Sequence, residues 1–148
     1  MEENNGKRLE RVSFVIPFSD KGELLSPHTK FDVDAFPTTI DLLVRVGFVG
    51  LKPKHRYAMT IYITPSHMQI NQGDSIQVGD SFSEIASVDI KTKEPHDNMY
   101  LDGQVTINIE RLKLPAKGIY QIKCNLSDYE SNEPVTTGNA YFSAERKL

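Results

Sequence analysis

The residues in this sequence that best suit metal or acid–base chemistry are its histidines and several aspartates in polar stretches. The histidines are His28, His55, His67 and His96. Loops at one end of a β-sandwich can converge, and a metal set could then form from the following residues: His28, Asp32, Asp34, His96 and Asp97. No spacing among them demands a metal site, so exposed loop residues are the simpler interpretation.

Calcium is a second candidate for the same acidic loops. Asp32, Asp34 and Asp97 are followed by Asp102 and Asp128, and Ca²⁺ takes six to eight oxygen ligands. A calcium- or lipid-binding C2-like domain is therefore an alternative. The acids here are spread more thinly than is usual in two calcium-binding loops.

Cys124 is the only cysteine, which excludes an intramolecular disulfide. It alternates with Tyr120, Ile122 and Leu126, and this pattern places its side chain on the inward face of a strand. A cysteine in that environment acts as a small apolar core residue rather than a nucleophile.

A short basic segment contains Lys52, Lys54, His55 and Arg56, with Tyr57 beside it. Its composition resembles a small nucleic-acid patch, but charge at the tip of a hairpin, which keeps the tip soluble, explains it as well. Lys54 and Arg56 are the candidate partner-binding residues of this segment.

Sequence fingerprints of common catalytic sites are absent. The chain has no glycine-rich phosphate loop, no G-x-G-x-x-G, no H-E-x-x-H, no G-x-S-x-G and no cysteine pair for zinc. No cofactor is expected, and a non-enzymatic role is favoured.

The segments that must position these residues are two apolar, β-rich runs within residues 40–65, joined by a short polar turn. Side chains in a strand alternate between two faces. Each run therefore has one apolar face: Leu42, Val44, Val46 and Phe48 on the first, and Tyr57, Met59, Ile61 and Ile63 on the second. These runs are expected at the centre of a sandwich.

Further strands are predicted over residues 12–18, 30–33, 82–90, 104–110, 119–126 and 139–145. In the first, Val12, Phe14, Ile16 and Phe18 share a face, and Pro17 favours an edge or a bulge. About seven or eight strands without an amphipathic helix predict an all-β fold, an antiparallel β-sandwich of immunoglobulin-like or C2-like type.

Composition is that of one soluble domain. The chain has 148 residues, of which 39% are hydrophobic and 25% charged, and a net charge of −3. We expect a flexible lead over residues 1–10 and a single sandwich over residues 11–148. The net charge argues against binding to nucleic acid or to an anionic membrane. The polar start and the lack of a long apolar run favour a cytoplasmic location.

Two short motifs carry a resemblance to a known family. Phe36-Pro37 precedes the central run, and Gly118-Ile119-Tyr120 opens a late strand. In these features the chain resembles an uncharacterised family of small bacterial β-sandwich proteins. The resemblance implies a fold and no catalytic residue.

The function most consistent with these observations is a protein-interaction or accessory module that binds through loops or an edge strand. A metal-dependent hydrolase built on loop histidines and aspartates is an alternative. The last predicted strand has no proline, and if it lies at an edge it would favour a homodimer, with Tyr141 as the anchor.

Overall fold

A computed structural model describes residues 8–19, 27, 29–70, 74–77, 83–93 and 101–148 of the chain. The described residues contain nine strands and no helix: β1 (Arg11–Ser19), β2 (Lys30–Val33), β3 (Thr38–Leu51), β4 (Arg56–Ile70), β5 (Asp74–Gln77), β6 (Ser83–Lys91), β7 (Leu101–Leu114), β8 (Gly118–Asp128) and β9 (Pro134–Arg146). None of the described segments is a helix long and apolar enough to cross a membrane.

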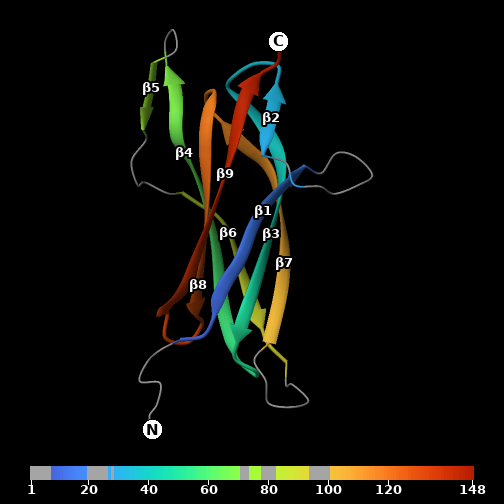
Figure 1. Ribbon diagram of the computed structural model, residues 1–148, viewed down its shortest axis with the longest axis vertical. Coiled ribbons are helices and arrows are strands. Elements are labelled where there is room, and N and C mark those ends of the chain that lie inside the picture. The colour runs from blue at the N-terminus through green and yellow to red at the C-terminus, as the bar shows by residue number, and fades with distance from the viewer. Residues whose placement is uncertain (1–7, 20–26, 28, 71–73, 78–82, 94–100) are drawn as a thin grey trace.

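The strands form two sheets packed face to face (Figure 1). The smaller sheet has the order β1-β3-β7, and the larger has the order β2-β9-β8-β4-β5, with β6 also paired to β4. β5 and β6 lie on the same side of β4, one after the other along its length. The predicted all-β sandwich is therefore confirmed.

The core lies between the sheets and comes from the alternating residues that the sequence pattern identified. Val44 and Val46 of β3 and Met59 and Ile61 of β4 are fully buried, and so is Cys124 of β8. Inward-facing residues of both sheets thus interdigitate, as expected for a sandwich.

The turn between β3 and β4 does not close a hairpin. The two strands lie in different sheets, so the turn carries the chain from one layer to the other. The two central runs form β3 and β4, which supply buried residues to the core as expected. The expectation that the basic residues lie at the tip of a hairpin is wrong.

One strand pairing is parallel among those described. Lys30 of β2 pairs with Ser143 of β9, and Val33 pairs with Arg146, in the same chain direction. The remaining pairings are antiparallel, as predicted. β2 has only four residues and lies far from β9 in the sequence, so no local sequence pattern predicts that the two strands pair.

The predicted face of the first strand is wrong beyond its first residues. A register shift between Val12 and Phe14 adds one residue to β1, and a bulge of this kind moves the following side chains to the opposite face. Val12 and Val15 pack on the core, opposite Phe48 and Val46.

After the shift, the aromatic residues of β1 lie on the outer face of the smaller sheet. The ring of Phe14 lies over Gly47, where an added Cβ would be 2.1 Å from a ring carbon. The guanidinium carbon of Arg45 is 5.0 Å from the Phe18 ring centroid. Pro17 lies in this edge strand, as predicted.

Candidate functional site

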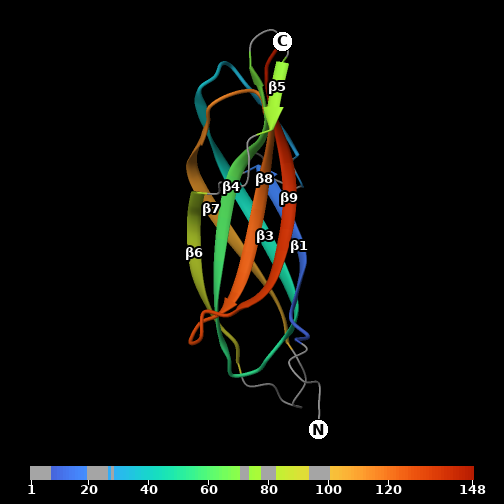
Figure 2. The same cartoon turned by 90° about the vertical axis from the view of Figure 1, so that its left-hand side faces the viewer.

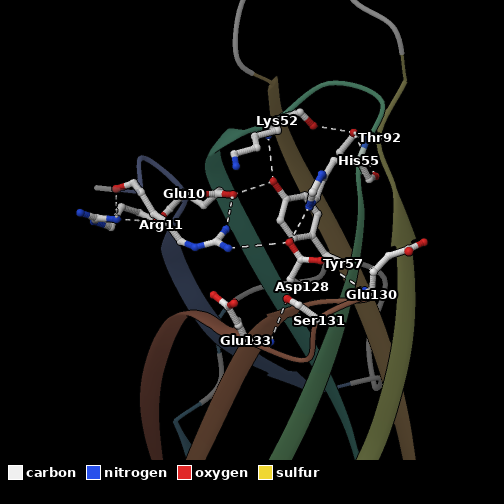
Figure 3. Close-up of polar contacts among 11 residues, drawn as sticks. Glu10, Arg11, Lys52, His55, Tyr57, Thr92, Asp128, Glu130, Ser131 and Glu133 are labelled. Atoms are coloured by element: carbon white, nitrogen blue, oxygen red, sulfur yellow. Dashed lines mark hydrogen bonds and ion pairs between the residues drawn. The ribbon is translucent and has the colours of Figure 1, made fainter. Parts of the chain in front are cut away.

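A polar cluster occupies one end of the sandwich, where the β3–β4 turn, the β8–β9 turn and the segment before β1 meet (Figure 3). Its centre is the hydroxyl of Tyr57. That hydroxyl accepts a hydrogen bond from the backbone N–H of Lys52 at 2.9 Å and donates one to Oε2 of Glu10 at 2.8 Å. Tyr57 therefore joins the turn to the N-terminal segment.

Glu10 is fully buried although it lies within the predicted flexible lead. Arg8 balances its charge, with Nη1 3.2 Å from Oε2. Oε1 has no hydrogen-bond partner among the described residues. Ordered structure thus begins before residue 11, and residues 1–7 of the predicted lead lie outside the described residues.

Gly50 allows the N-terminal segment to pass close to β3. Its φ is +75°, and a Cβ there would lie 2.4 Å from the carbonyl oxygen of Leu9. Both the backbone conformation and the space therefore require glycine. The close passage places Glu10 beside Tyr57.

His55 and Asp128 form the second half of the cluster. Nε2 of His55 lies 2.9 Å from Oδ2 of Asp128, and the His55 and Tyr57 ring centroids are 4.6 Å apart. The hydrogen bond from His55 lowers the pKa of Asp128 below its usual value. An ionised carboxylate only accepts hydrogen bonds, so Nε2 carries the proton.

The polar cluster holds the N-terminal segment to the two turns and has no group suited to catalysis among the side chains that the structure describes there. Burial is the main cause that raises the pKa of Tyr57 well above its usual range, so the phenol keeps its proton and cannot act as a base. Burial likewise raises the pKa of Cys124 to about 12, and that thiol lies in the core. No group of three metal-ligating side chains occurs within the described part of the chain.

Lys54 and Arg56, two of the sequence-predicted site residues, lie at this same end. The backbone N–H of Lys54 donates to the carbonyl of Lys93 at 3.3 Å. The guanidinium of Arg56 is paired with Asp89, with Nε 2.9 Å from Oδ1, and its carbon lies 3.5 Å from the Tyr129 ring centroid. Arg56 is thus held by an acid and an aromatic ring.

Tyr141, the third predicted residue, is far from the other two. It points outward from β9 with 52% of its surface exposed, opposite Gln121, which in turn pairs with Thr64. Roughly 25 Å of strand separate Arg56 from Thr64. The structure does not bring the three predicted residues into one site.

β9 is also not the open edge that the predicted dimer requires. β8 pairs with it on one side over most of its length. On the other side, β2 pairs with Ser143–Arg146, and Val12 and Val15 of β1 crowd Gly138. The C-terminal end of β9, Ser143–Arg146, is therefore covered by β2.

The acidic residues proposed for calcium divide between the two ends of the sandwich. Asp32 lies in β2 beside Glu145, and Asp34 is 3.8 Å from the amine of Lys147. Asp128 lies at the opposite end, in the polar cluster. His28, His96 and Asp97 lie outside the described residues, as does the side chain of His67.

One of the open strand edges among the described residues belongs to β7. This strand of 14 residues pairs with β3 on one side, and no described strand pairs with its other side. Val105 faces the core from β7 and is only half-buried. Sequence analysis identified the strand but not its edge position, because sheet order is set by tertiary packing.

Comparisons with known proteins identify the fold and no family. No family model matches the chain, and no curated protein does. Among solved structures, a bacterial adhesin from Mobiluncus mulieris containing intramolecular disulfide, isopeptide and ester cross-links is similar with a TM-score of 0.55 and 12% identity, over 94% of this chain and 58% of that chain. The β-glucuronidase 2 of Bacteroides uniformis is similar with a TM-score of 0.52 and 9% identity, over 90% of this chain and 14% of that chain.

These similarities define the class of protein as a β-sandwich domain. The chain spans little more than half of the adhesin chain and a small part of the glucuronidase chain. At such low identity the likeness concerns the fold alone.

Proposed function

We propose that the chain is a non-enzymatic protein-interaction module that binds another polypeptide through the open edge of β7. The observation that carries the proposal is the unpaired side of this 14-residue strand. Backbone groups of alternate residues in an antiparallel strand point to the same side. About half of the residues of β7 thus offer N–H and C=O groups to an added strand.

The polar cluster supports a binding role over catalysis. Its buried carboxylate, phenol and ion pairs tie the N-terminal segment to two turns. The only nucleophilic thiol lies in the core. Among the residues that the structure describes, no observation favours the metal-dependent and calcium-binding alternatives, since the acids there divide between opposite ends of the sandwich.

Three further expectations belong to the same proposal. The first is a cytoplasmic location, and the second is membership of the small bacterial β-sandwich family that the sequence resembles. The third is a partner that is neither nucleic acid nor membrane, which fits the modest net negative charge of the chain. Each rests on sequence pattern.

The test is a selection of peptides from a random display library on the immobilised protein. Two variants place a proline in β7, Val105→Pro and Thr106→Pro. The backbone N–H groups of neighbouring residues point to opposite sides of the strand, so one of the two variants removes an N–H at the free edge and the other removes one that faces β3. Selected peptides are expected to alternate apolar and polar residues. They should fail to bind whichever proline variant keeps the native melting temperature.

Tyr141→Lys is the matched control, since Tyr141 lies on the other sheet and faces solvent. It should bind the selected peptides as the wild type does. Peptides that bind both folded proline variants, or a selection that enriches no alternating sequence, would overturn the proposal. If both proline variants unfold, amide hydrogen exchange of β7 with and without peptide decides, and an unchanged exchange rate refutes edge binding.

A further inference from the structure

The stretch of β7 best able to accept a strand is Gly103–Ile109. Two register shifts in the pairing of β3 with β7 bound this regular stretch. One adds a residue to β7 between Ile109 and Leu112, and the other adds a residue to β3 opposite Leu101 and Gly103. Beyond it, Arg111 has a φ of +55°. Pairing by an added strand is therefore confined to the regularly paired segment Gly103–Ile109 of β7.

This segment lacks the devices that protect other edges. The sequence from Leu101 to Glu110 contains no proline and no lysine, and exposed edges usually carry one or the other, or a bulge. The opposite edge strand of the same sheet, β1, has Pro17 and a bulge within its paired length, whereas the bulge of β7 lies after Ile109 and outside Gly103–Ile109. The contrast within one sheet points to an edge that is used.

The side of the sandwich at β7 is also incompletely closed. β6 is the outer strand of the larger sheet on this side (Figure 2), and its inward-facing Val88 and Ile90 are half-buried, as is Val105 of β7. On the other side, Val12 of β1 lies directly over Gly138 of β9. A strand added to β7 would cover apolar surface that the single chain leaves exposed.

The segment is complementary to itself. If two copies of β7 pair antiparallel about a two-fold axis at Ile107, Val105 lies opposite Ile109 of the second copy, and Thr106 lies opposite Asn108. Apolar residues then face apolar ones, polar residues face polar ones, and no like charges lie opposite each other. A register centred on Thr106 would instead place Asp102 opposite Glu110, which is destabilising.

We infer that the partner strand at β7 is β7 of a second copy of this chain, paired antiparallel about Ile107 so that the two smaller sheets form one continuous sheet of six strands. The inference rests on the proposed function, since it names the occupant of the same edge. Such an interface is isologous, with the same surface used by both copies.

Sedimentation equilibrium over a wide range of concentration tests the dimer. The wild type and Tyr141→Lys should reach twice the mass of one chain. Whichever of Val105→Pro and Thr106→Pro keeps the native melting temperature should stay at the mass of one chain. A monomeric wild type, or a dimer that survives in the folded proline variant and is lost in Tyr141→Lys, overturns the inference.

Amide hydrogen exchange provides a readout that needs no variant. Alternate amides within Gly103–Ile109 should exchange more slowly as protein concentration rises, whereas amides of β9 should not change. Exchange rates in β7 that are independent of concentration would contradict the dimer even if both proline variants fail to fold.

Cross-linking fixes the register. A double variant, Thr106→Cys with Asn108→Cys, should form an intermolecular disulfide, and Thr106→Cys alone should not. Cross-linking of the single variant would place the axis at Thr106 and refute the proposed register. A wild type that selects alternating peptides yet remains monomeric would refute this inference and leave the proposed function standing. A dimer through β7 that captures no peptide would support this inference and exclude binding of other polypeptides at the edge.

Discussion

The hydroxyl of Tyr57 in β4 links this strand to the β3–β4 turn and to the segment before β1. Tyr57→Phe should lower the free energy of unfolding by about 1–3 kcal/mol, because it leaves the Lys52 N–H and one hydrogen-bond site of the buried Glu10 unsatisfied. Urea denaturation measures the change. Tyr120→Phe is the control, since that hydroxyl bonds only the backbone of Ala116, and an equal or larger cost there would contradict the anchor role of Tyr57.

The thiol of Cys124 should be inert in the folded protein. Burial raises its pKa to about 12, so almost no reactive thiolate exists near neutral pH. Labelling by a thiol reagent is expected to be slow in the native state and fast in denaturant. Rapid native labelling would mean that the side chain faces solvent and that the register of β8 differs by one residue.

The His55–Asp128 pair should make stability depend on pH in the acid range. The pKa of Asp128 is lowered in the fold, chiefly by His55. Its contribution is therefore fully present above the unfolded pKa of about 3.9 and is lost as the pH falls through the folded pKa. In His55→Ala, the pKa of Asp128 should rise toward its ordinary value, as followed by carboxyl NMR.

The matched control for this titration is Asp89. Arg56 lowers the pKa of Asp89, and His55 does not contribute, so Asp89 should titrate identically in the wild type and in His55→Ala. An Asp128 titration that is the same in both proteins would show that the hydrogen bond in Figure 3 has no electrostatic effect.

At the scale of the strands, the approach of β1 to β9 requires Gly138. An added Cβ would lie 2.4 Å from Cγ1 of Val12, so Gly138→Ala should destabilise the protein by about 1–3 kcal/mol through overpacking. Combining it with Val12→Ala should cost less than the sum of the single changes, because the second substitution removes the clash. Additive costs in thermal or urea unfolding would contradict the contact.

The strand elements were predictable from the sequence where alternation was regular. Val105, Ile107 and Ile109 face inward in β7, and Tyr141 and Phe142 point to opposite faces of β9 as expected. In such strands each inward residue is apolar, so the pattern specifies the buried face.

Two kinds of feature could not be predicted from the sequence: those that depend on which segments meet in the fold, and those that depend on an extra residue inserted in a strand. Phe14 and Phe18 keep the alternation of Val12 in the sequence, yet one extra residue moves them to the other face. Glu10 is a charged residue in a polar segment. Its burial is tolerable because Arg8, two residues away, pairs with it and because folding brings the hydroxyl of Tyr57 within hydrogen-bond distance. The candidate residues Lys54, Arg56 and Tyr141 were chosen by type, whereas the open edge of β7 depends on sheet order.

At the scale of the whole molecule, the pairing of β2 with β9 has a consequence for how the chain folds. Lys30 must find Ser143, and β3 must find β7 across the intervening strands, so native contacts join distant parts of the sequence. Chains of such high contact order fold in roughly milliseconds to seconds. Stopped-flow refolding should fall in this range, and microsecond folding would contradict the described topology.

On the ribosome, β2 emerges long before the strand it pairs with. During that interval β2 has no native strand to pair with, and unpaired edges of nascent chains are sites of misassociation. Translation speed and chaperone binding should therefore influence the yield of folded protein.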